Sequence, residues 1–122
     1  MQSTLRAIRG ATTVDMNEAG VIQRATRDLL EEIFARNAVD QEDLVCIFFS
    51  ATPDLTAAFP ASGAHELGLS DVPLFGTAEL AVDGALERCI RVMVQCYSQR
   101  SRSEIRHVYT NGAVVLRADL VD

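Results

Sequence analysis

Residues Cys89 to Tyr97 read CIRVMVQCY, and apolar residues recur at every second position of this stretch. On an extended chain, side chains two positions apart point to the same side. One side would therefore be apolar, formed by Ile90, Val92, Val94 and Cys96. The other side would carry Arg91, Met93, Gln95 and Tyr97. We interpret the stretch as a strand, although Ala85 to Met93 also fits a helix.

A helix is predicted after the extended segment Leu5 to Val14, with Asp15 and Asn17 as candidate caps and Asn37 as the stop. Apolar residues recur there at spacings of three and four, which places them on one stripe. The stripe comprises Ile22, Ala25, Leu29, Leu30, Ile33 and Phe34. Val45 to Ser50 (VCIFFS) is a short apolar run typical of a buried central strand.

The polar loop ATPDLTAAFP follows, and then a short helix is expected at Ala61 to Leu67, before Gly68. Val72 to Phe75 predicts a further strand, with Pro73 indicating an edge or a strand start. His107 to Tyr109 and Ala113 to Leu116 flank Asn111-Gly112, a strong turn signal. One long helix beside about five strands predicts a single α+β domain, residues 1–122, with a mixed, mostly antiparallel sheet.

Composition limits the function classes. The chain has 122 residues and a net charge of −6, which argues against nucleic-acid binding because that needs a basic face. All 11 basic residues are Arg, a planar bidentate donor to carboxylates, although biased genomic composition also explains this. Three cysteines fit neither a disulfide framework nor a zinc spacing. With no signal or membrane segment apparent, we expect a soluble cytoplasmic protein without a membrane partner.

The sequence contains no Gly-rich phosphate loop, nucleophile motif or metal signature, and its two histidines, His65 and His107, lack a cluster. Arg91 is the first functional candidate, because a charge within an apolar strand is costly unless it is paired or faces a functional cavity. A solvated or structurally paired arginine is the alternative. Several arginines, one tyrosine and one glutamate at strand ends could together bind a multiply anionic small molecule: Arg9, Arg91, Arg117, Tyr109 and Glu79.

Five segments resemble a known family. The family is the AroH class of chorismate mutases, and the segments are RAIRGATTV (6–14), SATPDLTAAFPA (50–61), CIRVMV (89–94), and IRHVY (105–109) with AVVLRADL (113–120). The resemblance is collinear over nearly the whole chain. It implies a homotrimeric pseudo-barrel with active sites between subunits. It also implies the cofactor-free rearrangement of chorismate, a dianion, to prephenate in the shikimate pathway to phenylalanine and tyrosine.

The resemblance also implies roles for individual residues. Arg91 resembles the donor to the ether oxygen of the breaking bond, and Arg9 and Tyr109 resemble the pair that holds a carboxylate. Glu79 resembles the acceptor of the ring hydroxyl, with a backbone N–H near Gly76 donating to it. The remaining substrate-binding candidates are the cleft residues Phe59, Ala61, Leu74 and Phe75 and the tail residue Arg117.

Some positions depart from the family pattern. Gly76 stands where relatives often carry Cys or Ser, Ser62 and His65 where some carry Lys and Arg, and Ala118 where proline is common. Two other functions stay open at the level of sequence, the second of them because of Gly76. One is a RidA-like enamine or imine deaminase, and the other is a trimer that binds chorismate or prephenate without turnover.

Overall fold

A computed structural model describes residues 2–116, so the candidate Arg117 lies outside the described residues. The strands are β1 (Thr4–Thr13), β2 (Leu44–Ala51), β3 (Leu74–Ala78), β4 (Cys89–Ser98) and β5 (Val108–Tyr109). The helices are α1 (Ala19–Asn37) and α2 (Ala61–His65), and short 3₁₀ turns occur at Gln41–Asp43, Arg102–Glu104 and Asn111–Val115.

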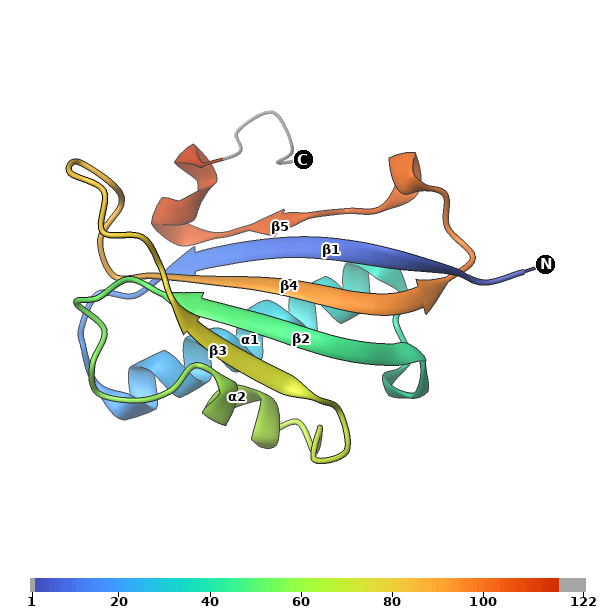
Figure 1. Cartoon of the computed structure of the whole chain (residues 1–122), viewed down its shortest axis with the longest axis horizontal. Coiled ribbons are helices and arrows are strands. Elements are labelled where there is room, and N and C mark those ends of the chain that lie inside the picture. Colours follow the sequence, from blue (N-terminus) through green and yellow to red (C-terminus); the bar gives the residue numbers. More distant parts are fainter. Residues whose placement is uncertain (1, 117–122) are drawn as a thin grey trace.

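The five strands form one mixed sheet in the order β3-β2-β4-β1-β5. The central pairings, β1 with β4 and β2 with β4, are antiparallel, whereas the outer pairings, β2 with β3 and β1 with β5, are parallel. Helix α1 crosses behind the sheet in Figure 1. This architecture confirms the predicted α+β class.

The main core lies between the helices and one face of the sheet. Leu29, Leu30 and Ile33 of α1 and Ala64 of α2 pack in one cluster with strand residues such as Val92. Helix α2 approaches α1 closely at Gly63, where a Cβ atom would lie 2.5 Å from the carbonyl oxygen of Gln23. A side chain at this position would therefore push the two helices apart.

The alternation in β4 confirms the predicted strand and shows that the helical alternative for Ala85 to Met93 was wrong. Its core-facing residues, Ile90, Val92, Val94 and Cys96, are at most 4% exposed. Arg91, between two of them, is exposed. The period of two decides the structure here because β4 pairs along its whole length with β1 and over most of it with β2.

Strand β2 lies inside the sheet, between β3 and β4, but the chain covers only one of its faces. Ile47 and Phe49 are buried, whereas Phe48 between them is 42% exposed. The Phe48 ring meets Phe75 of β3 edge to face, with ring centroids 6.1 Å apart. We call the sheet face opposite the helices the bare face. It carries apolar side chains that no part of residues 2–116 fully covers: Leu5, Phe48, Phe75 and Tyr97.

Helix α1 confirms the apolar stripe but not the predicted caps. It ends at Asn37 as expected, and Ala38 then adopts a left-handed conformation (φ 50°). Its start is capped by neither Asp15 nor Asn17, because Glu18 is the N-cap and makes no side-chain capping bond. The Asn17 side chain instead binds Thr56 and Ala57 in the loop after β2. A tertiary contact therefore replaces the local cap.

Two boundaries also differ from the sequence prediction. Strand β3 begins two residues later than Val72 and continues to Ala78, because its backbone pairs with β2 from Ile47 to Ala51. Its position at the sheet edge agrees with Pro73 as a strand start. After Asn111 (φ 53°), Ala113 to Val115 belong to a 3₁₀ turn and not to a returning strand.

Candidate active site

Four of the predicted functional residues line one cavity of about 510 Å³. Arg9 comes from β1, Glu79 follows β3, Arg91 lies on β4 and Tyr109 ends β5. The cavity is also lined by residues that sequence reasoning did not single out, including Ser50, Met93 and Leu116. Arg9 and Tyr109, which are 100 positions apart in the sequence, therefore meet at one cavity of the sheet.

Strand register explains why Arg91 and Tyr109 share this face with Ser50. Tyr109 pairs with Ala11, Ala11 with Arg91, Arg91 with Ser50, and Ser50 with Thr77. These residues form one row across the five strands, and residues directly opposite each other point to the same face. A shift of one residue in any strand would turn its member of the row toward the other face.

Glu79 and Arg91 form the charged centre of the cavity. Arg91 Nε lies 3.3 Å from Glu79 Oε2, and the Ser50 hydroxyl donates to the same oxygen at 2.8 Å. The backbone N–H of Glu79 donates to the Ala51 carbonyl at 3.0 Å, which fixes the chain just after β3. Glu79 is therefore held both through its backbone N–H and through its side-chain carboxylate.

Arg9 and Tyr109 lie on the neighbouring strands of the same cavity. The backbone N–H of Arg9 donates to His107 Nδ1 at 2.9 Å, so this nitrogen carries no proton. The Arg9 guanidinium makes no hydrogen bond or ion pair with any side chain of the described chain. Tyr109 is 8% exposed. Two guanidinium groups against one carboxylate give the cavity a net positive charge, which suits an anionic ligand.

Cys89, beside this centre, is buried at the start of β4. Burial raises the pKa of the Cys89 thiol above its usual 9.0, although the Arg91 guanidinium acts in the opposite direction. The thiol is therefore protonated at neutral pH and is a poor nucleophile.

A second cavity of about 550 Å³, with no charged residue among those that line it, adjoins the first and contains two other candidates, Phe59 and Gly76. The two cavities share Phe49, Thr77 and Ala78 in their walls. Phe59 is 81% exposed, which is unusual for a large aromatic side chain. A Cβ atom added to Gly76 would have no heavy atom within 4 Å, so the position has room for a side chain.

The remaining candidates lie elsewhere in the single chain. Ala61 and Leu74 are partly buried and pack against the main core, and Phe75 is on the bare face. None of the three lines either cavity. Ser62 is half-buried in α2, and His65 is exposed at its end.

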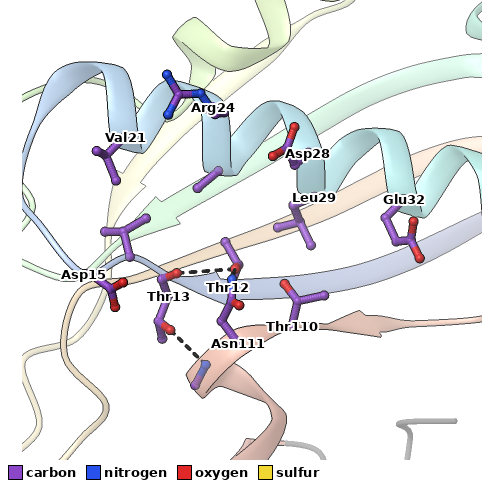
Figure 2. Close-up of a pocket in the computed structure, with 13 residues that line it drawn as sticks. Thr12, Thr13, Asp15, Val21, Arg24, Asp28, Leu29, Glu32, Thr110 and Asn111 are labelled. Carbon is purple, nitrogen blue, oxygen red and sulfur yellow. Dashed lines mark hydrogen bonds between the residues drawn. The ribbon is translucent and has the colours of Figure 1, made fainter.

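A cavity of about 660 Å³ on the other side of β1 has the opposite electrostatic character. It lies between β1, α1 and the 3₁₀ turn after β5, and three carboxylates, Asp15, Asp28 and Glu32, line it with one arginine, Arg24 (Figure 2). An anion is repelled here, so size alone does not identify the site. Within residues 2–116, no group of three His, Cys, Asp or Glu side chains could hold a metal ion, and no helix could span a membrane.

The fold and this site agree with the result of comparing the chain with known proteins. The model of the family "chorismate mutase type I" matches residues 5–120. The chain therefore belongs to the chorismate mutase type I family, which confirms the resemblance seen in the sequence.

Individual relatives are similar over almost their whole length. The chain is 45% identical to chorismate mutase AroH from Bacillus subtilis, over 95% of this chain and 92% of that protein. It is 41% identical to chorismate mutase AroH from Thermus thermophilus, over 95% of this chain and 96% of that protein. The solved structure of a chorismate mutase from Clostridium thermocellum is 44% identical, with a TM-score of 0.89, and the match covers 90% and 98% of the two chains.

Proposed function

We propose that this protein is an isomerase that rearranges chorismate to prephenate for phenylalanine and tyrosine synthesis. The observation that carries the proposal is the single cavity in which Arg9, Arg91, Glu79 and Tyr109 converge. Family membership supports the same reaction and does not favour a RidA-like deaminase. The reaction is unimolecular and needs no proton transfer, nucleophile, redox partner or cofactor.

Arg91 stabilises the transition state in this proposal. The carbon–oxygen bond lengthens during the rearrangement, and negative charge grows on the ether oxygen. A cation fixed at that point lowers the barrier because it needs no reorganisation during the reaction. Arg91 is well held for this role, since Ile90 and Val92 on either side are buried and Glu79 contacts its Nε. A rate gain of around 10⁶ requires about 8 kcal/mol of preferential stabilisation.

The other residues bind and orient the folded substrate. Arg9 and Tyr109 hold a carboxylate, and Glu79 accepts a hydrogen bond from the ring hydroxyl, near the backbone N–H at Gly76. Selecting the folded conformer contributes to the rate by orientation. The remaining contacts in this proposal come from Phe59, Ala61, Leu74, Phe75 and Arg117.

The active enzyme is a homotrimer of this single 122-residue domain, with each site between two subunits, and it works in the cytoplasm. Two features support the trimer. The bare face carries exposed aromatic side chains, and three further apolar residues, Phe59, Leu80 and Val115, are 81%, 78% and 70% exposed. Apolar groups exposed on this scale are typical of an association surface. A neighbouring subunit would also bring Ala61, Leu74 and Phe75 of one chain to the cavity of another.

The deciding experiment follows the loss of chorismate absorbance with purified protein. Wild type is expected to form prephenate, and Arg91→Ala is expected to lose nearly all kcat while it stays folded. Arg24→Ala is the matched control, because it removes an arginine from the acidic cavity. Turnover by folded Arg91→Ala at the control rate contradicts the mechanism. Tight binding of prephenate by a wild type without turnover supports the non-catalytic alternative, to which the missing side chain at Gly76 would contribute.

A further inference from the structure

The two oxygens of the Glu79 carboxylate have different surroundings. Oε2 accepts from the Ser50 hydroxyl at 2.8 Å and is 3.3 Å from Arg91 Nε. Oε1 has no hydrogen-bond partner among residues 2–116, although the Glu79 side chain is only 28% exposed. An ionised carboxylate only accepts hydrogen bonds, and each oxygen can accept more than one. One oxygen is therefore bound to the protein and the other is open to a ligand.

This arrangement is not the one that a carboxylate and a guanidinium adopt by themselves. Such a pair commonly forms two parallel hydrogen bonds, which occupy both carboxylate oxygens and two guanidinium nitrogens. In this site both contacts fall on one oxygen. Ser50 accounts for the difference, because its hydroxyl lies in the same strand row as Arg91 and binds the oxygen that Arg91 approaches.

We propose that Ser50 is a positioning residue that keeps the Glu79–Arg91 pair open for the substrate. It holds Oε2, so that Oε1 remains available for a ligand hydroxyl and Arg91 is not bound in a closed bidentate pair. The inference rests on the proposed mutase function and adds to it a residue that acts through Glu79 and not on the breaking bond. Ser50 lies one position before the end of β2, where Ala51 also accepts the Glu79 N–H, so the strand end positions both parts of Glu79.

The test compares three variants in the chorismate assay, with circular dichroism and Tm to verify folding. Ser50→Ala removes the donor, and kcat is expected to fall about 10- to 100-fold, the range for a hydrogen bond to a charged group. Ser50→Thr keeps a hydroxyl on a strand that accepts β-branched residues, so kcat is expected within about threefold of wild type. Ser98→Ala is the control, since it removes a strand serine at the far end of β4.

A double-mutant cycle separates positioning from a general structural effect. In a Glu79→Ala background, Ser50→Ala is expected to cause no further loss, because the carboxylate it orients is gone. An equal loss of kcat in both backgrounds, or a Ser50→Ala variant as active as Ser98→Ala, overturns the proposed role of Ser50. Neither result affects the proposed mutase function. A folded wild type that does not convert chorismate overturns the proposed function itself and the inference with it. Measuring wild-type turnover first distinguishes the two failures.

Discussion

At the residue scale, the shape of the Arg91 side chain matters as much as its charge. Arg91 contacts Glu79 through Nε, a group that lysine lacks. The planar guanidinium of arginine can bind Glu79 through one nitrogen and the substrate through another. A lysine ammonium has only one nitrogen and cannot do both in this way. Arg91→Lys is therefore expected to lower kcat about 100-fold or more while the Tm changes little. Steady-state kinetics and thermal melting check this. A variant with nearly wild-type kcat contradicts the idea that Arg91 binds Glu79 and the substrate through different nitrogens.

Gly76 gives the second prediction at this scale. A glycine inside a strand costs about 0.5–1 kcal/mol relative to a residue with a side chain, and Gly76 has open space where a Cβ would lie. Gly76→Cys is expected to hold or raise the Tm and to lower KM, because the strand end that leads to Glu79 becomes stiffer. Gly63→Cys is the contrasting variant, since it must clash with Gln23 and lower the Tm. A fall in the Tm of Gly76→Cys would show that the space is filled in the assembled protein.

At the scale of elements, the loop from Thr52 to Pro60 carries Phe59 and is tied down at two points. Asn17 Oδ1 accepts the N–H groups of Thr56 and Ala57, both at 3.0 Å, and its Nδ2 donates to Thr56 Oγ1 at 2.8 Å. Removing these three bonds frees the segment next to Phe59. Asn17→Ala is expected to raise KM more than it lowers kcat, with a modest fall in Tm. Asp15→Ala, an exposed neighbour, is the control, and equal KM values for the two variants contradict this role for Asn17.

Asp54 forms the second tie and gives a pH prediction. Desolvation pushes the pKa of Asp54 upward, but hydrogen bonds from the Thr52 hydroxyl and the Arg88 N–H outweigh it and lower the pKa below 3.8. A folded-state pKa below the unfolded value stabilises the protein above the unfolded pKa. This contribution is lost as the pH falls through the folded pKa.

The wild type is therefore expected to have a higher Tm than Asp54→Asn near neutral pH. The difference should persist down to about pH 4 and shrink at lower pH, as Asp54 becomes protonated. Thermal melting of both proteins from neutral pH down to about pH 3 measures this. A Tm difference that grows as the pH falls would mean that the charge of Asp54 destabilises the loop.

At the scale of the whole molecule, the bare face is the feature that a single chain leaves unexplained. Phe48 lies near its middle, beside Phe75, and a carboxylate there would be desolvated on association. If the wild type is the proposed trimer, Phe48→Asp is expected to give a folded monomer in light scattering. Ala35→Asp, on the exposed side of α1, is expected to remain trimeric. A trimeric Phe48→Asp would place the subunit interface elsewhere.

Local patterns determined the parts of the fold that neighbouring residues control. The period of two in β4, the stripe of α1 and the stop at Asn37 were predicted because a few consecutive residues specify each of them. The motif segments indicated the family for the same reason, since each is a run of consecutive residues. The assigned roles of Arg9, Arg91, Glu79 and Tyr109 stay predictions, but their convergence in one cavity is what those roles require.

Only the tertiary structure decided which distant groups meet. Ser50 was not singled out by its sequence pattern, because a serine at the end of an apolar run looks like any strand end until its register with Arg91 is known. Asn17 was predicted as a helix cap but binds a loop 39 positions away, since side-chain donors choose among all nearby backbone groups. Strand register and loop packing arise from contacts between segments far apart in the chain, and local periodicity carries no information about them.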